Sequence, residues 1–228
     1  MLTTYIPLTA QTGSEPALTI ANMVVAFMQD APFCWPTNRA EDSSLTTVAG
    51  TPDYTLSITN FGFLETVTLT NSGKSFAVPN VYNSKALGFS NEQTSRPNAV
   101  SVKAIVPGTS VSLRFLSAPD LVYTGKTTYQ MAPVLFSATS QDWFTQCNIT
   151  GNQIQIYNNL FLAECFQVNG DEQSAALYRR RGMASLLATA EGLTEMQARM
   201  IFEQASFMDI QSIAASLRTQ LAQQDRTV

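Results

Sequence analysis

Three consecutive arginines, Arg179-Arg180-Arg181, form the densest charge cluster in the sequence. On a helix, adjacent side chains point about 100° apart, so these three guanidinium groups cannot share one face. They are either solvated or ion-paired, or one of them belongs to a phosphate site. Arginine suits a subunit interface because its planar group binds carboxylates in a bidentate manner. We therefore predict that at least one of Arg179, Arg180 and Arg181 pairs with an acid of a neighbouring subunit.

The other reactive residue types give no catalytic pattern. The sequence has no histidine, the usual proton carrier near neutral pH and the commonest metal ligand. Cys34, Cys147 and Cys165 are odd in number and lack CxxC spacing, which indicates neither a disulfide framework nor a thiolate metal site. The acid pairs Glu41-Asp42 and Asp171-Glu172 lie where helix starts and loops place acids. We predict no enzyme activity, no cofactor and no metal, with an Asp- or Glu-dependent enzyme as a residual alternative.

The composition indicates a folded chain with an unusually uncharged surface. Of 228 residues, 45% are hydrophobic and only 13% are charged, with a net charge of −4. This balance excludes a disordered chain and favours burial of part of the surface against another subunit. An acidic total also argues against a dedicated nucleic-acid binder. The longest clean apolar run, Met23 to Met28, is far shorter than the ~20 residues of a membrane span, and the first residues lack a basic export signal.

Residues 1–40 are predicted to hold an N-terminal segment and the first helix of a bundle. Ser14 can cap this helix, Pro16 lies in its first turn, and Pro32 ends it. The helical spacing is carried by Leu18, Ala21, Val25 and Met28.

Residues 41–150 are predicted to form an inserted β domain. Tyr54, Leu56 and Ile58 alternate with polar residues, as expected of a half-buried strand. Asn71-Ser72-Gly73 predicts a hairpin loop, and Pro107-Gly108 predicts another between two further strands. With about six or seven strands in all, the spacing is typical of a small antiparallel sandwich or barrel.

Residues 151–208 are predicted to hold the C-terminal helices of the bundle. One helix runs from Asn152 to Asn169-Gly170, a second from about Asp171 to Ala190, and a third from about Glu195 to Ala205. The predicted fold class is therefore α+β, a bundle of one N-terminal helix and three to four C-terminal helices with an inserted β-sandwich or barrel. The helices are apolar over a wide arc, so we predict that they face other subunits, with Met200 and Phe202 in that contact.

Residues 209–228 are predicted to be a docking segment for a partner protein. Four apolar residues make a narrow stripe on a polar helix that ends in an uncapped tail containing Arg226: Ile210, Ile213, Leu217 and Leu221. A helix with so thin a stripe at a chain end is only marginally stable in water. The alternative is a fourth helix packed on its own bundle.

One stretch resembles a known family. Leu113-Arg114-Phe115-Leu116-Ser117-Ala118-Pro119-Asp120, followed by Tyr123, Tyr129 and Pro133, resembles a motif of the head-to-tail adaptor proteins of tailed bacteriophages. Other pieces resemble that family in order: Asn38-Arg39, Gly50 with Asp53-Tyr54, Phe61 to Glu65, Arg96-Pro97, Tyr157 with Leu162-Ala163-Glu164, and Asp171-Glu172 with Ala176 and Tyr178.

The resemblance implies a virion structural protein without catalysis. It implies a homo-oligomeric ring in the neck, dodecameric to match the portal, which is assembled in the host cytoplasm and connects the portal to downstream tail or nozzle proteins. Genome DNA would pass through the central channel without sequence-specific binding, and no membrane is involved. In such a ring an arginine of the triplet could instead point into the channel. The alternative is a monomeric β-sandwich module that binds a carbohydrate or a receptor and is decorated with helices.

Overall fold

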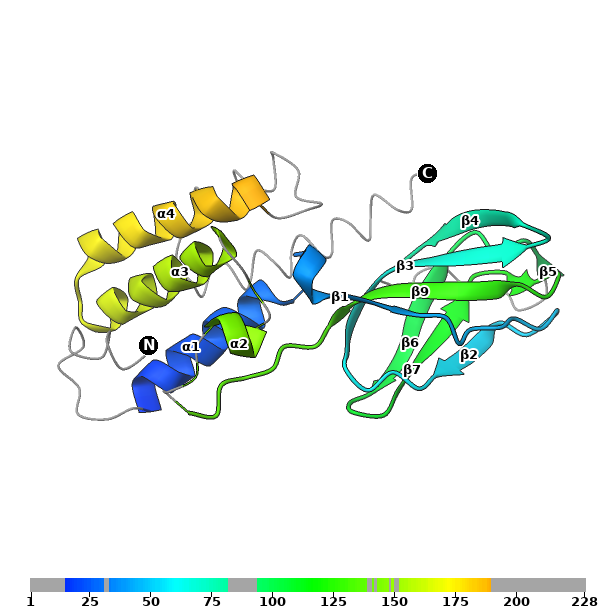
Figure 1. The fold of residues 1–228 in the computed structure, drawn as a ribbon, viewed down its shortest axis with the longest axis horizontal. Coiled ribbons are helices and arrows are strands. Elements are labelled where there is room, and N and C mark those ends of the chain that lie inside the picture. Colours follow the sequence, from blue (N-terminus) through cyan, green and yellow to red (C-terminus); the bar gives the residue numbers. More distant parts are fainter. Residues whose placement is uncertain are drawn as a thin grey trace. The chain divides into compact units, whose positions relative to one another are not determined.

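The computed structural model describes residues 15–30, 33–81, 94–138, 141, 143–147, 149 and 152–189. The chain is a mixed α+β protein in which helices and strands segregate into two compact units (Figure 1). Among the described residues, those up to Asn38 and those from Pro133 onward form a helical unit, and Arg39–Ala132 form a strand unit. The strand unit thus ends at Ala132 and not at residue 150, and the segment after Pro133 belongs with the helices. None of the described helices combines the length and the apolar character that crossing a membrane requires.

The helical unit contains four α-helices and a short 3-10 turn among its described residues: α1 (Glu15–Met28), η3 (Pro36–Asn38), α2 (Trp143–Cys147), α3 (Asn152–Val168) and α4 (Glu172–Thr189). α1, α3 and α4 agree with the predicted helices to within two residues. α3 and α4 lie side by side as an antiparallel pair, and α1 packs against α3 (Figure 1). The helices predicted after residue 190 lie outside the described residues.

The core of the helical unit joins segments that are far apart in the sequence. Trp35 is only 1% exposed, and its Nε1 donates a 2.6 Å hydrogen bond to the carbonyl of Met28, which folds the chain back after α1. Asn22 on α1 accepts a 2.7 Å hydrogen bond from the amide of Phe136 and donates one of 3.1 Å to its carbonyl. The Gln29 amide donates to the Cys147 carbonyl at 3.2 Å. These bonds explain why residues after Pro133 associate with α1.

The described residues of the strand unit form three sheets. Its strands are β1 (Arg39–Asp42), β2 (Asp53–Leu56), β3 (Phe61–Asn71), β4 (Lys74–Pro79), β5 (Thr94–Ser95), β6 (Val100–Val106), β7 (Ser110–Phe115), β8 (Ala118–Pro119) and β9 (Thr124–Met131). A four-stranded sheet has the order β1-β9-β3-β4, a three-stranded sheet has the order β2-β7-β6, and β5 pairs with β8. Both larger sheets are antiparallel, as predicted, whereas the short β5–β8 pair is parallel.

A single hydrophobic core lies within the strand unit. The four-stranded sheet contributes Leu64, Val67 and Leu69 from β3, all fully buried. The three-stranded sheet contributes Leu113 and Phe115 from β7, where buried and half-buried positions alternate as a period of two requires. The register of β3 against β9 shifts around Gly62 and again after Leu64. At each shift the side of β3 whose side chains point into the core is exchanged for the other side.

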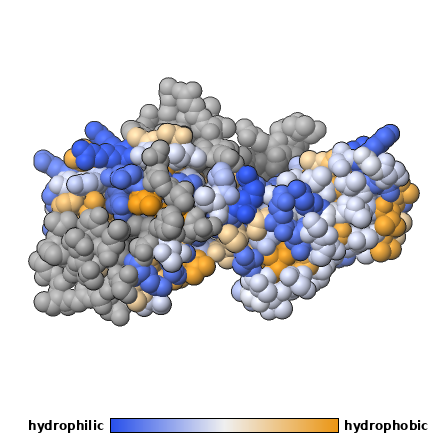
Figure 2. Space-filling view, in the orientation of Figure 1, coloured by the Kyte–Doolittle hydropathy of each residue, from blue (hydrophilic) through white to orange (hydrophobic). Residues whose placement is uncertain are grey.

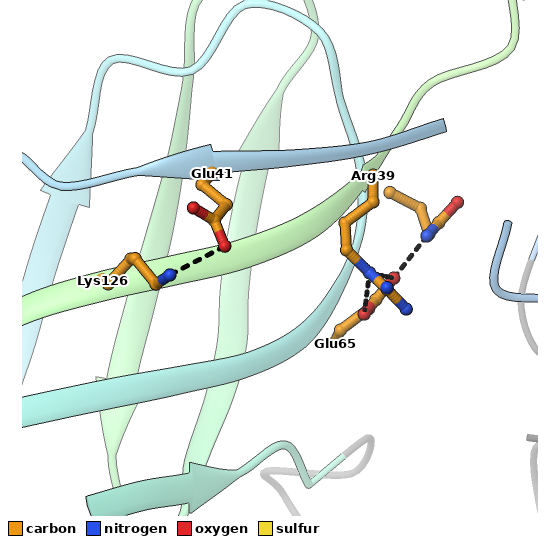
Figure 3. A network of polar contacts seen from close by, with 5 residues as sticks. Arg39, Glu41, Glu65 and Lys126 are labelled. Atoms are coloured by element: carbon orange, nitrogen blue, oxygen red, sulfur yellow. Dashed lines mark hydrogen bonds and ion pairs between the residues drawn. The ribbon is translucent and has the colours of Figure 1, made fainter. Parts of the chain in front are cut away.

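β1 and β9 bring the two ends of the strand unit together. Arg39 on β1 lies opposite Gln130 on β9. Two ion pairs link these strands and their neighbour β3 (Figure 3): the Arg39 Nε contacts the Glu65 carboxylate at 2.8 Å, and the Lys126 ammonium contacts Glu41 at 2.8 Å. Gln130 also donates a hydrogen bond to Glu65. The chain therefore enters and leaves the unit through adjacent, cross-linked strands.

Candidate functional site

A groove of about 520 Å³ opens on the strand unit beside the β3–β4 hairpin. We call it the basic groove and define it by its lining residues: Asn71, Lys74, Ser75, Phe76, Arg96, Leu121 and Tyr123. These residues come from the hairpin, from the segment after β5 and from the loop before β9.

The hairpin that carries one wall of the groove is held by its turn and by one long-range bond. Ser72 and Gly73 both have positive φ, 49° and 76°, which is the conformation that a two-residue hairpin turn needs. Asn71 and Lys74 are therefore paired across the turn. The Asn71 amide donates a 2.7 Å hydrogen bond to the Val122 carbonyl, which fixes the hairpin against the loop before β9.

The arginine of the groove lies on the Phe76 ring, and a second ring, Tyr123, packs against Phe76. The Arg96 guanidinium carbon lies 3.7 Å from the centre of the Phe76 ring, within the range of a cation–π contact. Tyr123 meets Phe76 edge to face at 5.5 Å, and its hydroxyl donates a 2.7 Å hydrogen bond to Asp120. This bond and the nearby Asp120 charge raise the pKa of Tyr123. Since the guanidinium rests on a ring, its N–H groups stay available at the ring edge.

Among the described residues of the strand unit, the basic side chains divide into those that form ion pairs and the two that line the groove. Four basic side chains of this unit form ion pairs: Arg39 with Glu65, Lys103 and Arg114 with Asp53, and Lys126 with Glu41. Lys74 and Arg96 form no ion pair with any residue that the structure describes. Two cations beside an apolar surface can bind a carboxylate- or phosphate-bearing group.

The described side chains offer binding chemistry more readily than catalysis. Cys165 is 1% exposed, and burial raises the pKa of its thiol to about 12, so it is protonated at neutral pH. Burial likewise raises the pKa of Tyr157. Within the described residues, no three His, Cys, Asp or Glu side chains are grouped so as to hold a metal ion. That the protein is no enzyme and needs no cofactor stays a prediction.

The arginine triplet lies on α4, and its side chains diverge. Arg179 is 7% exposed and donates a 3.0 Å hydrogen bond to Glu164 on α3, so its partner is an acid of the same chain. Burial raises the pKa of Glu164, although the Arg179 charge opposes this shift. Arg180 and Arg181 are exposed, and Arg181 lies 5.6 Å above the ring of Tyr178. Pairing with a neighbouring subunit stays a prediction for Arg180 and Arg181.

A second charged surface lies at the turn between α3 and α4. Asp171 and Glu172 are both exposed, and the Asp171 carboxylate caps α4 by accepting a 3.0 Å hydrogen bond from the Ser174 amide. Hydrogen bonding by the Ser174 side chain, and then by the Ser174 amide, lowers the pKa of Asp171 and keeps it ionised. Val168 and Leu177, close by in the sequence, are 51% and 48% exposed. We call Val168, Asp171, Glu172 and Leu177 the acidic turn.

The other predicted site residues lie outside the described residues: Met200, Phe202, Ile210, Ile213, Leu217, Leu221 and Arg226. Their roles stay predictions. The basic groove was not predicted from the sequence, because Phe76 and Arg96 meet only through the fold. The one sequence feature that could have indicated the groove is the position of two basic residues, Lys74 and Arg96, beside strands in a chain with few charges.

No protein-family model matches the sequence, and no curated protein matches it either.

Proposed function

We propose that the protein is a virion structural protein of a tailed bacteriophage, a head-to-tail adaptor that forms a homo-oligomeric ring under the portal. In this proposal the helical unit is a bundle, and the strand unit is a β-sandwich inserted after its first helix. The ring connects the portal to the tail or nozzle proteins, and genome DNA passes through its centre. Its place is the neck of the virion.

The observation that carries the proposal is the order of the elements along the chain. Among the described residues, one α-helix, α1, precedes the strand unit, and α2 and the antiparallel pair α3 and α4 follow it. The resemblance implies the same order of helix, inserted strands and closing helices.

The residues that carry the resemblance also have structural roles that suit a motif. Asp120 accepts the hydroxyl hydrogen bond of Tyr123, and the Pro119 carbonyl accepts the amide of Gly50 at 2.8 Å. Tyr129 is 6% exposed and donates a 3.1 Å hydrogen bond to Asn60. The Pro119–Gly50 bond thus joins β8 to the segment before β2, and the Tyr129–Asn60 bond joins β9 to the segment before β3.

The surface of the protein supports self-association. Figure 2 shows a visible face of the strand unit on which strongly hydrophilic residues are sparse and hydrophobic residues reach the surface. The exposed apolar side chains include Val48, Leu121 and Val122, each more than half exposed. A ring subunit buries two different faces against its neighbours. A surface with few charged residues is suited to such burial.

The test is the mass of the purified protein, alone and with a portal protein from the same genome. We expect particles whose mass is a multiple of 24.9 kDa, and a ring on the portal in electron micrographs. A variant truncated after Asp209 is the matched control, since it should fold and no longer bind the portal. A protein that stays monomeric at all concentrations and ignores the portal would contradict the proposal.

The basic groove favours a second candidate, a monomeric module that binds a carbohydrate or a receptor. Its aromatic rings and its two cations without carboxylate partners could hold an acidic sugar. This candidate predicts a monomer of 24.9 kDa and saccharide binding that Phe76→Ala abolishes.

A further inference from the structure

The two charged surfaces defined above are complementary in charge and in apolar character. The basic groove presents Lys74 and Arg96 beside Leu121, which is 52% exposed. The acidic turn presents the exposed Asp171 and Glu172, and Val168 and Leu177, which lie within six residues of them in the sequence, are about half exposed. Each surface therefore offers two like charges with an apolar flank, and the signs are opposite.

The net charges of the two parts of the chain have the same signs as the two surfaces: the strand unit is basic and the remaining residues are acidic. Residues 39–132 hold seven basic and six acidic residues, a net charge of +1. The remaining residues hold six basic and eleven acidic residues, a net charge of −5. A copy of this chain therefore carries a weakly basic strand unit and an acidic remainder, so that unlike parts of two copies attract each other.

We propose that the basic groove of one copy binds the acidic turn of a second copy. The inference rests on the proposed ring and names the contact that builds it. Because the two surfaces differ and lie on different units of one chain, the contact is head-to-tail: the first copy keeps a free acidic turn, and the second keeps a free basic groove. A contact of this type closes into a ring when its rotation allows closure.

The chemistry of the groove suits a carboxylate occupant. Arg96 makes no side-chain hydrogen bond to any described residue, and Phe76 beneath it leaves the N–H fork free for a bidentate carboxylate. Lys74 supplies a second positive charge for the adjacent acid. Asp171 and Glu172 likewise form no ion pair among the described residues, so both acids are available. Leu121 would then cover part of the exposed apolar surface of Val168 or Leu177.

The experiment reverses the charges of each surface in the full-length chain and measures self-association by sedimentation velocity. Lys74→Glu with Arg96→Glu, and separately Asp171→Lys with Glu172→Lys, should each weaken self-association about tenfold or more. All four substitutions in one chain should restore assembly, because the charges are then exchanged. A one-to-one mixture of the two double variants should also assemble, with the variants alternating, because the acidic groove of one meets the basic turn of the other and the basic groove of the second meets the acidic turn of the first.

The control is a variant with the same change of charge outside the groove, Lys103→Glu with Lys126→Glu. These lysines form exposed ion pairs of the strand unit, which contribute little to stability, so this variant should assemble like the wild type. Circular dichroism establishes that each variant is folded. If one double variant does not fold, the variant that carries all four substitutions still tests the contact.

The outcomes separate this inference from the proposed function. A wild type that forms rings, together with groove and turn variants that also form rings, overturns the inference and leaves the ring in place. A wild type that never assembles overturns both. If the variant with all four substitutions is folded but does not assemble, the inference is also overturned.

Discussion

Arg179 and Glu164 form a buried ion pair that joins α3 and α4, with side chains only 8% and 13% exposed. Burial raises the pKa of Glu164 in spite of the arginine, so the cost of removing the carboxylate from water exceeds the attraction that the pair regains. The pair is thus a constraint on how the two helices pack more than a source of stability.

This pair gives the first prediction. Glu164→Ala should destabilise the protein by about 3–5 kcal/mol, because it leaves the arginine charge buried without its carboxylate. Replacing both residues, Glu164→Met with Arg179→Met, should cost less than either single substitution. Urea unfolding measures all variants, and a double variant as unstable as the sum of the singles would contradict this account.

The thiol of Cys165 gives a second prediction, about pH. Its pKa is about 12 in the folded protein, against about 8.5 for a thiol in an unfolded chain. Between these two pKa values the folded state keeps the thiol proton that the unfolded state has lost. The contribution of the thiol to the free energy of unfolding is therefore fully present below the pKa of the unfolded chain and decreases as the pH rises above it. Between about pH 8 and about pH 9.5, the wild type should lose about 1 kcal/mol more than Cys165→Ala. Parallel pH profiles for the two proteins would show that this thiol does not contribute.

At the scale of elements, Gly62 in β3 allows two backbones to approach closely. A Cβ at this position would lie 2.8 Å from the Met131 carbonyl oxygen and 2.9 Å from that of Gln130. The register shift of β3 against β9 occurs at this residue. The glycine is therefore required for the pairing of β3 with β9 at this end of the sheet.

We predict that Gly62→Ala destabilises the protein by about 1–3 kcal/mol, because backbone atoms must move to admit the methyl group. Gly73→Ala is the control, since a Cβ there meets no atom within 4 Å and only the positive φ opposes it. Its cost should be about 1 kcal/mol. Thermal unfolding measures the stability of both variants. If Gly62→Ala loses no more stability than Gly73→Ala, the close approach of the backbones at Gly62 does not matter for stability.

Elements with a local signal were predictable from the sequence. α1 follows from Leu18, Val25 and their helical spacing, and Pro16 and Pro32 mark its limits. The β3–β4 hairpin follows from Asn71-Ser72-Gly73, whose last two residues adopt the positive φ that the turn requires.

Elements without a local signal were missed. β1 reads Arg-Ala-Glu-Asp, with no apolar alternation, and it is a strand because β9 offers a partner. The path after Pro133 depends on the Asn22–Phe136 bonds across 114 residues, and the basic groove depends on Arg96 meeting Phe76. Pairings of this kind are properties of the assembled fold, so periodicity in the sequence does not report them.

At the scale of the whole molecule, the two hydrophobic cores share no residue. The core of the helical unit contains residues from α1, α3 and the segment between Phe136 and Ile149, and the core of the strand unit lies between Leu45 and Tyr129. Each core is closed within its own unit, which allows the units to fold separately.

We predict that a fragment of residues 39–132 folds alone. It keeps every residue of its core and the ion pairs that link β1, β3 and β9, so its amide protection in hydrogen exchange should match that of the full chain. Calorimetry of the full chain should then show two transitions, one of which matches the fragment. A fragment without protected amides would contradict the independence of the unit.

The pairing of β1 with β9 has a consequence for the order in which the chain folds. Before the strand unit folds, the chain between α1 and the closing helices is a loop of more than ninety residues; afterwards its two ends are neighbours, at Arg39 and Gln130. The folded unit shortens the chain that must close between α1 and α3 from the 123 residues 29–151 to the 31 residues 29–38 and 131–151, which costs about 1 kcal/mol less entropy. The rate at which α1 finds α3 is therefore governed by a unit that contributes nothing to their core. By the same geometry, an ancestral gene could gain or lose the strand unit by one insertion or deletion, and the helices on either side would still meet.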